Sequence, residues 1–321
     1  MRPMYINGKF TNGNAREVIE VQNPATEEIL DSVPRGTADD IEAAVAAAKS
    51  AFDPWRKTGS FERANLLHEV AEKVHAHREE IARLLTLEQG KPISENEEEI
   101  EWVLNTFRYY AELGRHHRGS VLAPATTSQF NFIIKEPYGV VGCIVPWNFP
   151  LLLMAWKVAP ALAAGNTVVI KPSEMTPLTA LYMAEHCFDH LPIGVVNVVT
   201  GYGLETGEPL VKHPDVPVIA FTGSLATGQR IASLAAPMMK KLHLELGGKD
   251  ATVIAEDADP VIAAKAVAYA ALINAGQVCT STERVYIPRR GAAKFTEAIV
   301  EHVKSLRLGP GLESTTDMGP M

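Results

Sequence analysis

Three residues that lie far apart in the chain have side chains suited to covalent chemistry on a carbonyl group. Cys279 follows Gly276 and Gln277 at the end of an Ala-rich run, where a loop can turn its sulfur toward a cleft. Glu245 precedes a Gly-Gly pair, and Asn148 lies within the segment Pro-Trp-Asn-Phe-Pro. Together they offer a thiol nucleophile, a carboxylate base and an amide that stabilises an oxyanion. Taken singly, Cys279 is more simply a small buried apolar residue, and Asn148 a turn residue between prolines.

Two junctions between a predicted strand and a predicted helix carry residues suited to a nucleotide. Lys171 and Glu174 follow one strand, at the carboxyl edge where open α/β sheets bind ligands, and they could hold the hydroxyls of a ribose. Taken alone, this pair is more simply a surface ion pair. Gly223 and Ser224 begin the other helix and could present N–H groups and a hydroxyl to a pyrophosphate. The Gly-x4-Gly spacing that ends at Gly228 is not followed by Lys-Ser/Thr, which excludes the phosphate-binding loop of NTPases.

Composition and charge exclude several classes of protein. The chain has 321 residues, of which 46% are hydrophobic, so it can bury a large core and exceeds one ordinary domain. Its net charge of −8 gives no electrostatic reason to expect nucleic acid or an anionic membrane as a partner. The cysteines are few and widely separated, no apolar run reaches the ~20 residues of a membrane span, and the start lacks the apolar core of a signal peptide. These features predict a soluble cytoplasmic enzyme, and no pattern of side chains supports a metal site.

The order of predicted elements indicates an α/β fold with an open, mostly parallel, Rossmann-like sheet. Residues 5–33 contain short strands and turns, and strands alternate with helices from residue 138 onward. Between these parts, four helices are expected to begin at Thr37, at Ser60, near residue 78 and at Ser94. The predicted strands are 140–145, 167–171, 195–200, 218–222 and 241–245, and the predicted helices between them are 151–164, 177–188, 203–212 and 225–235.

Residues 118–137 differ in pattern from their surroundings. Phe130, Phe132 and Ile134 alternate with other residues between two prolines, which predicts a β-hairpin. The pattern alone leaves two interpretations open. The hairpin is either an arm that interrupts the larger domain or an edge strand of that domain's own sheet.

A second domain is expected after Gly247-Gly248, beginning with a strand near 251–254. In it, Asp259 can cap a helix and Pro260 can occupy its first position, so that this helix delivers Cys279. In the first domain, the acidic run Glu95–Glu101 is interpreted as a solvated helix face.

In this order and with these neighbours, Asn148, Glu245 and Cys279 resemble the active-site residues of the aldehyde dehydrogenase superfamily, and the resemblance covers essentially the whole chain. It implies that the chain ends within the catalytic domain, and that a complete chain forms a homodimer or homotetramer. The domains implied are a coenzyme domain over 1–117 and 138–247, an oligomerisation arm over 118–137, and the first part of a second α/β, catalytic domain over 248–321.

The resemblance also implies roles for the coenzyme residues. Lys171 and Glu174 would hold the adenosine ribose, and Ser224 would bind the pyrophosphate. A free carboxylate at Glu174 repels a 2′-phosphate, so NAD is favoured and NADP is the alternative. This chain has Leu225-Ala226 where the family often has Thr-Glu. The other coenzyme residues implied are Ile144, Val145, Trp147, Gly223, Gly228 and Leu246.

The implied reaction is the oxidation of an apolar or amino-aldehyde to a carboxylic acid. Cys279 would attack the aldehyde carbon, Asn148 would stabilise the oxyanion, and Glu245 would activate water to hydrolyse the thioester. Lys157 is a candidate for a proton relay. Phe149, Trp156 and Val278 either line a substrate tunnel or belong to the core. Two alternatives stay open: acyl transfer to coenzyme A on the same scaffold, and a partial chain that binds nucleotide without turnover.

Overall fold

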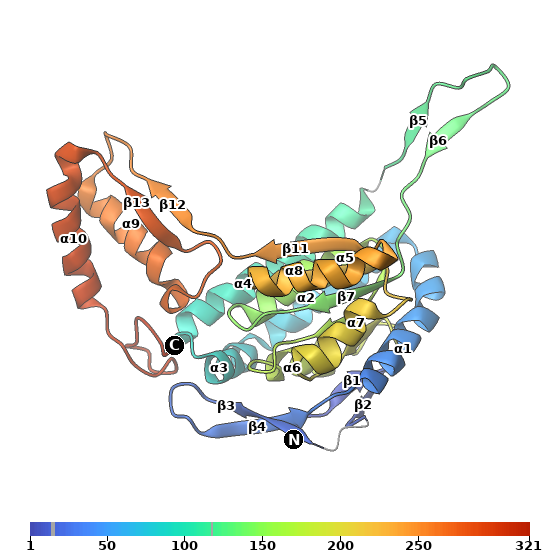
Figure 1. The fold of residues 1–321 in the computed structure, drawn as a ribbon, viewed down its shortest axis with the longest axis horizontal. Helices are drawn as coiled ribbons and strands as arrows, with labels where there is room; N and C mark the ends of the chain where they lie inside the picture. The colour runs from blue at the N-terminus through green and yellow to red at the C-terminus, as the bar shows by residue number, and fades with distance from the viewer. Residues whose placement is uncertain (14–16, 117) are drawn as a thin grey trace.

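The computed structural model describes residues 1–13, 17–116 and 118–321, and a seven-stranded sheet lies at the centre of this described part (Figure 1). Five of its strands run parallel, and β1 and β2 extend it as an antiparallel edge. The spatial order is β11 (Lys241–Leu246), β10 (Val218–Gly223), β7 (Val140–Ile144), β8 (Thr167–Lys171), β9 (Val196–Val198), β1 (Met4–Ile6) and β2 (Lys9–Thr11).

The parallel strands are joined by helices, which confirms the predicted α/β fold. From β7 the chain proceeds outward to β8 and β9, then returns to build β10 and β11 on the other side of β7. The direction of winding therefore reverses between β7 and β10, and open α/β sheets bind ligands beyond the carboxyl ends of the strands at such a point. The connecting helices are α5 (Pro150–Ala163), α6 (Leu178–His186), α7 (Glu208–Lys212) and α8 (Leu225–Ala235).

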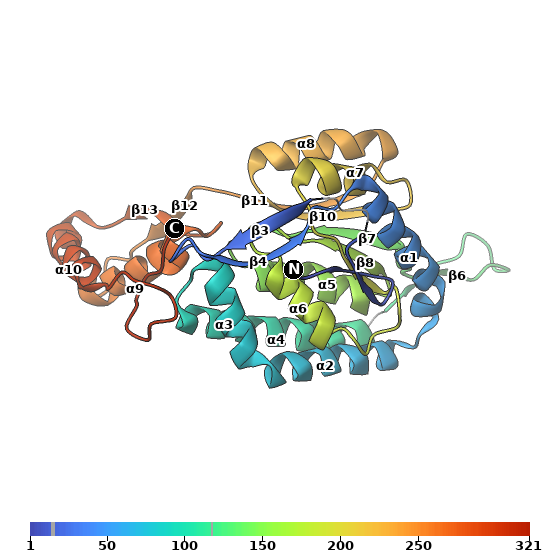
Figure 2. The same cartoon turned by 90° about the horizontal axis from the view of Figure 1, so that it is seen from below.

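Helices cover both faces of the sheet. In Figure 2, α7 and α8 lie on one face, and α2, α4, α5 and α6 lie on the other. Helix α1 packs with α7 and α8. Its residues Ile41, Ala44 and Val45 belong to one apolar cluster with Leu210 of α7 and Ile231 of α8. The sequence produces this arrangement because apolar residues recur at helical spacing. The N-terminal helices are α1 (Ala38–Lys57), α2 (Ser60–Ala76), α3 (Arg78–Gln89) and α4 (Ile93–Arg115).

The helices predicted over 151–164 and 177–188 are observed as Pro150–Ala163 and Leu178–His186, and two other predicted helices differ for an identifiable reason. Helix α4 begins at Ile93 rather than Ser94, because Pro92 occupies the cap position and the Ile93 N–H donates to the carbonyl of Gly311 at 2.8 Å. The helix predicted over 203–212 is divided into a wide π turn, η1 (Gly203–Gly207), and the short helix α7. A proline at residue 209, in the first turn of α7, removes a backbone donor at that junction.

The predicted hairpin within 118–137 forms a sheet of its own. Strands β5 (Ser120–Leu122) and β6 (Asn131–Ile133) pair antiparallel and project from the body (Figure 1). The alternative, an edge strand of the main sheet, is therefore wrong. Phe130 and Phe132 are mostly exposed, with their ring centroids 5.9 Å apart. A second hairpin, β3 (Val18–Gln22) and β4 (Ile29–Pro34), lies along the other side of the body.

Beyond β11 the chain builds a smaller α/β unit. Strands β12 (Asp250–Val253) and β13 (Thr282–Tyr286) are parallel and joined through α9 (Pro260–Leu272), whose N-terminus is capped by the Asp259 side chain. The remaining elements of the chain are η2 (Ala236–Met238), η3 (Ile273–Gly276), η4 (Arg289–Gly291) and α10 (Ala292–Ser305). The division into coenzyme and catalytic domains stays a prediction, and its boundary residue 117 lies outside the described residues.

Candidate active site

The structure joins the loop that contains Asn148 to the loop that contains Cys279. Asn148 lies between β7 and α5, and its side-chain amide donates to the carbonyl of Gln277 at 2.8 Å. In the opposite direction, the Asn274 side-chain amide donates to the backbone carbonyl of Asn148 at 2.9 Å. Reciprocal hydrogen bonds across 126 to 129 residues of sequence thus hold the loop that contains Asn148 against the loop that contains Cys279.

Cys279 follows a turn with an unusual backbone. Asn274, Ala275 and Gly276 have φ angles of 51°, 54° and 77° in succession. Asparagine and glycine adopt this left-handed region readily, but an alanine there costs roughly 1–2 kcal/mol. The turn is over-determined by hydrogen bonds, since the Gln277 backbone and side chain both donate to the Asn274 carbonyl at 3.0 Å. Strain held in this way is typical of functional sites.

Cys279 is the exposed thiol of the chain. Cys143 and Cys187 are buried, and burial raises the pKa of each to about 12. A thiol must ionise to act as a nucleophile, so these two are unreactive near neutral pH. Cys279 alone among the three is placed to meet a substrate.

Glu245 and Lys157 line one pocket. Glu245 lies near the end of β11 with its side chain about half exposed and within 3.4 Å of the His243 imidazole. Lys157, on α5, is buried and donates to the Thr222 hydroxyl at 2.6 Å and to the Leu153 carbonyl at 3.1 Å. The pocket has a volume of ≈ 390 Å³ and is lined by Asn105, Thr106, Tyr109, Tyr110, Trp156, Lys157, His243 and Glu245.

The electrostatics of Lys157 connect this pocket to the cysteine loop. Burial lowers the pKa of Lys157 to about 8, and electrostatic interactions with Cys143, Glu245 and Cys279 act in the opposite direction. Lys157 is therefore within electrostatic range of both Glu245 and Cys279. An ammonium group whose pKa is near neutrality can exchange protons, so the predicted relay role is chemically reasonable.

A buried acid fixes the helix on which Lys157 lies. The carboxylate of Glu99 accepts from the N–H groups of Leu151 and Leu152 at 3.0 and 2.9 Å, at the start of α5, and forms a buried ion pair with Lys91. Lys91 also lies 3.8 Å above the centre of the Phe149 ring. The interpretation of residues 95–101 as a solvated face is therefore wrong for Glu99, which supplies the cap that α5 lacks.

At the carboxyl edge of the sheet, the two residues predicted to hold a ribose form an ion pair with each other. Lys171 is buried at the end of β8 and lies 3.1 Å from the carboxylate of Glu174, whose side chain is 37% exposed. Burial lowers the pKa of Lys171, and the charge of Glu174 opposes that shift. Glu174 and Trp147 line a pocket of ≈ 440 Å³ together with Gln277, which belongs to the cysteine loop.

The other predicted coenzyme residues lie at the same edge. Ser224 caps α8, because its hydroxyl accepts from the Thr227 N–H at 3.2 Å. Gly228 on α8 packs closely on the end of β11, since a Cβ there would lie 2.7 Å from a methyl of Leu246 and that side chain would have to shift. The remaining residues are Gly223 at the end of β10, Ile144 at the end of β7, and Val145, which is buried and donates its N–H to the Lys171 carbonyl.

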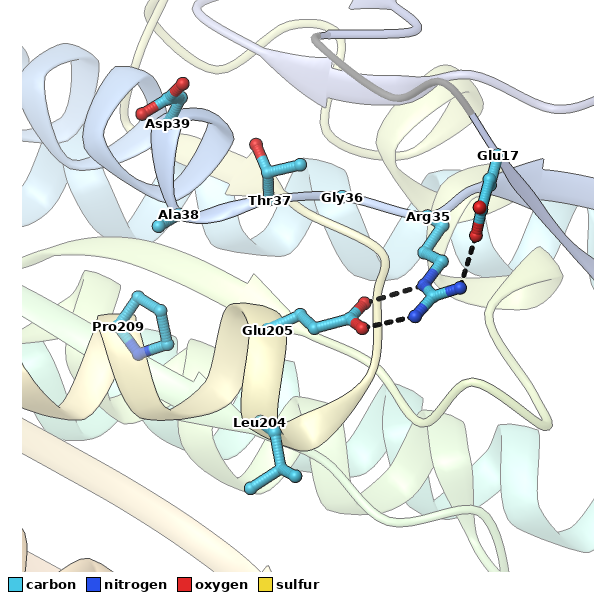
Figure 3. Close-up of a pocket in the computed structure, with 9 residues that line it drawn as sticks. All are labelled: Glu17, Arg35, Gly36, Thr37, Ala38, Asp39, Leu204, Glu205 and Pro209. Atoms are coloured by element: carbon cyan, nitrogen blue, oxygen red, sulfur yellow. Dashed lines mark hydrogen bonds and ion pairs between the residues drawn. The ribbon is translucent and has the colours of Figure 1, made fainter.

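A larger pocket, of ≈ 830 Å³, lies elsewhere, and none of the predicted site residues lines it (Figure 3). It lies between the start of α1 and η1. Among the described residues that line it, Arg35 is held between the carboxylates of Glu17 and Glu205, with 2.9 Å between the Arg35 Nε and Glu205. An arginine neutralised by two acids is a poor anion site, so we place the chemistry at the smaller pockets.

Asn274, Gln89 and Glu95 are important for the geometry of the cysteine loop but were not predicted from the sequence. Gln89 donates to the Asn274 side-chain oxygen at 2.7 Å, and Glu95 accepts from the Asn274 N–H at 2.9 Å. The Asn-Ala-Gly triplet was the available signal for a left-handed turn. Within the described residues there is no cluster of three or more potential metal ligands, and no helix is both long and apolar enough to cross a membrane.

The structure thus has a mostly parallel α/β sheet, with the Asn148 loop hydrogen-bonded to the segment before Cys279, and comparison with known proteins gives the family. Residues 10–321 match the model of the aldehyde dehydrogenase family. The chain is 41% identical to betaine aldehyde dehydrogenase 1 of Oryza sativa subsp. japonica, and the match covers 99% of this chain and 65% of that protein. The chain belongs to the aldehyde dehydrogenase family.

Other relatives and solved structures agree. Peroxisomal aminoaldehyde dehydrogenase 2 of Pisum sativum is 40% identical over 100% of this chain and 65% of its own length. The NAD+ complex of an aldehyde dehydrogenase from Bacillus cereus has a TM-score of 0.96 and 41% identity, covering 100% of this chain and 66% of that one. An NADP-dependent enzyme from E. coli has a TM-score of 0.97 and 36% identity, and the match covers 100% of this chain and 67% of that chain. The chain thus spans about two thirds of the length of its relatives.

The predicted cytoplasmic location is wrong by the same comparison. The relatives include the peroxisomal enzyme of Pisum sativum and a chloroplastic betaine aldehyde dehydrogenase of Amaranthus hypochondriacus. Composition and sparse cysteines are common to many reducing compartments, so they cannot distinguish the cytoplasm from an organelle.

Proposed function

We propose that this chain provides the active site for NAD-dependent oxidation of an aldehyde to a carboxylic acid, with Cys279 as nucleophile. The observation that carries the proposal is the pair of reciprocal hydrogen bonds that hold the Asn148 loop against the Cys279 loop. The relatives named as betaine aldehyde and aminoaldehyde dehydrogenases support the reaction class. The coenzyme residues, together with Asn148, Lys157 and Glu245, would then belong to the domain over 1–117 with 138–247, and Cys279 would belong to the domain over 248–321.

The chain's own residues account for the steps. The Cys279 thiolate adds to the carbonyl carbon. The carbonyl oxygen becomes negatively charged and accepts hydrogen bonds from the Asn148 amide and the Cys279 N–H. NAD held by Lys171, Glu174 and Ser224 would supply the hydride acceptor for oxidation of the resulting thiohemiacetal. This leaves a thioester on Cys279, and Glu245 removes a proton from the water that hydrolyses it, releasing the acid and restoring the thiol. Lys157, with its pKa of about 8, would pass that proton onward.

The coenzyme fits the residues at the sheet edge. Lys171 and Glu174 lie at the end of β8, beside the point where the winding of the sheet reverses, and would hold the adenosine ribose. Ser224 and Gly223 lie at the start of α8, where a pyrophosphate is favoured. In this structure the Ser224 hydroxyl accepts from the Thr227 N–H and donates to the Thr227 hydroxyl at 2.9 Å, so a phosphate would compete with Thr227 for the hydroxyl hydrogen.

Glu174 is expected to favour NAD over NADP. Replacing Glu174 with serine removes a carboxylate that repels a 2′-phosphate, so the ratio of the two dissociation constants should shift toward NADP by roughly two- to fivefold, the range for a partly exposed charge. Calorimetric titration with NAD and NADP measures this ratio. Glu185→Ser, which removes an exposed acid from α6, serves as the control. An unchanged ratio in the Glu174 variant would count against the ribose assignment.

The substrate is proposed to be an apolar or amino-aldehyde. Trp156 and Tyr109 give the pocket beside Lys157 an aromatic lining, and Glu245 adds a negative charge. Aromatic faces and a carboxylate both attract a cation. Phe149, by contrast, is buried beneath Lys91 and belongs to the core.

The hairpin β5–β6 is proposed to bind a second copy of the chain. Its exposed apolar side chains include Val121, Phe132 and Ile134. Phe132→Asp places a charge on this surface, so the dissociation constant for self-association should rise by about thirtyfold, the effect of an interface hot spot. Sedimentation analysis measures it. Ser128→Asp at the exposed tip is the matched control, and equal self-association of the two variants would refute the assignment.

One assay tests the proposed function directly. Adding betaine aldehyde or an aminoaldehyde with NAD to the purified chain should produce NADH, read by its absorbance. Because the chain spans about two thirds of its relatives, the second candidate is nucleotide binding without turnover. NAD binding with no NADH formed supports that candidate, and absence of both contradicts the proposal.

A further inference from the structure

The side chain and backbone of Asn274 connect three parts of the molecule. Asn274 is buried, and its side-chain amide contacts Asn148 in the loop that follows β7. Its side-chain oxygen accepts from Gln89 at the end of α3. Its backbone N–H donates to the carboxylate of Glu95 in the first turn of α4, at 2.9 Å. The left-handed turn before Cys279 is thus held from outside its own segment.

The contact with Glu95 differs from the others because it orients the backbone itself. Asn274 is the first of the three left-handed residues, so the direction of its N–H fixes how the chain leaves α9. A buried backbone N–H that loses its acceptor is costly. The conventional interpretation, an acid on a solvated helix face, does not fit a half-buried carboxylate that accepts from a residue 179 positions away.

We propose that Glu95 is a positioning residue for the nucleophile: by accepting the Asn274 N–H, it holds the left-handed turn that leads to Cys279 and keeps this loop against the Asn148 loop. The inference rests on the proposed function for its biological meaning, but not for its geometry. Glu95 does not touch the reacting atoms. It acts through Asn274.

The charges around Glu95 make this contact sensitive to pH. Burial raises the pKa of Glu95 to about 7 from its ordinary 4.5, while the Asn274 N–H and Lys91 lower it and Glu98 and Glu99 raise it. On the facing helix α9, the Tyr269 hydroxyl donates to Glu98. The ionised form of Glu95 is disfavoured in the closed turn. The free energy needed to open the turn is therefore greatest below pH 4.5 and falls as pH rises through about 7.

Hydrogen exchange of residues 273–281 tests the proposal in the chain without coenzyme or aldehyde. Glu95→Leu leaves the Asn274 N–H without its acceptor, so exchange should become about ten- to a hundredfold faster at fixed pH. Glu95→Gln keeps a neutral acceptor and should retain protection. The ratio of the exchange rate of the unaltered chain to that of Glu95→Gln should rise through about pH 7 when measured from pH 5.5 to 8.5. It should rise because the carboxylate of Glu95 ionises in this range and the amide of the glutamine does not. The intrinsic pH dependence of exchange cancels in this ratio.

Glu98→Gln is the matched control, since it removes a neighbouring acid that contacts Tyr269 rather than the turn. It should not accelerate exchange of residues 273–281 at pH 8.5, because removing the repulsion between Glu98 and Glu95 favours the closed turn. If Glu95→Leu exchanges like the unaltered chain while β7 and β8 remain protected, the proposal is overturned. If Glu95→Leu fails to fold, the exchange rate of the unaltered chain divided by that of Glu95→Gln decides. A ratio that stays constant from pH 5.5 to 8.5 overturns the proposal, and a ratio that rises supports it.

Turnover gives an independent readout. Where the chain oxidises aldehyde, Glu95→Leu should lower kcat at least about tenfold and leave the dissociation constant of NAD unchanged, because Lys171 and Glu174 are untouched. Glu95→Gln should restore kcat. Equal kcat in Glu95→Leu and the unaltered chain overturns the proposal. The exchange result does not depend on catalysis, so failure of the proposed oxidation is distinguishable from failure of this inference.

Discussion

Replacing Cys279 with alanine should eliminate aldehyde-dependent NADH formation, a loss of at least about a thousandfold, on the scale seen when the nucleophile of a covalent catalyst is removed. The reason lies in the sequence of steps. Without the sulfur there is no thiohemiacetal, and an aldehyde itself is a poor hydride donor. Steady-state absorbance of NADH measures the rate, and titration with NAD checks that the coenzyme site is unaffected.

Cys187→Ala is the control for this experiment. Cys187 is buried at the end of α6, and its raised pKa makes it unreactive near neutral pH. Its replacement should leave the rate per folded molecule unchanged. Iodoacetamide should likewise label Cys279 ahead of Cys143 and Cys187, because only Cys279 is exposed. Undiminished NADH formation by Cys279→Ala would exclude a cysteine mechanism.

Much of the fold could be predicted from local pattern. The strand over 167–171 and the helix over 225–235 are observed with the predicted bounds, because a β-branched run buried on both faces and an apolar helical stripe are strong signals. The helix predicted over 203–212 failed because its beginning contains two glycines and a proline, which weaken helix formation and permit a π turn.

The candidate site shows where sequence reasoning reached its limit. Lys171 and Glu174 are three residues apart, so their ion pair follows from local geometry. The roles of Glu95 and Glu99 could not be deduced, because both depend on partners more than fifty residues away: Leu151 and Leu152 for Glu99, and Asn274 for Glu95. An acidic run on a helix looks solvated until the element that covers it is known.

Glu245→Gln should separate the two halves of the reaction. The first half needs Cys279, Asn148 and NAD, so one equivalent of NADH should form in a burst. The second half needs a general base, because water is a weak nucleophile at neutral pH, and loss of that base should slow steady-state turnover by about 10²–10⁴-fold. Glu245 is partly exposed in the pocket that contains Lys157, so water can reach it. Rapid-mixing absorbance gives the burst, and mass spectrometry of the stalled protein should find an acyl group on Cys279.

The same variant distinguishes hydrolysis from acyl transfer to coenzyme A. A thiol acceptor attacks the thioester without the help of a base, so an enzyme built for acyl transfer would not need a carboxylate at residue 245. In the unaltered chain we therefore expect the free acid as product, with no acceleration by coenzyme A. His243→Gln, which removes the imidazole 3.4 Å from Glu245 but keeps the carboxylate, is the matched control and should still release acid. Steady-state acid release at an unchanged rate by Glu245→Gln would show that another group activates the water, and formation of acyl-coenzyme A by the unaltered chain would establish the rival chemistry.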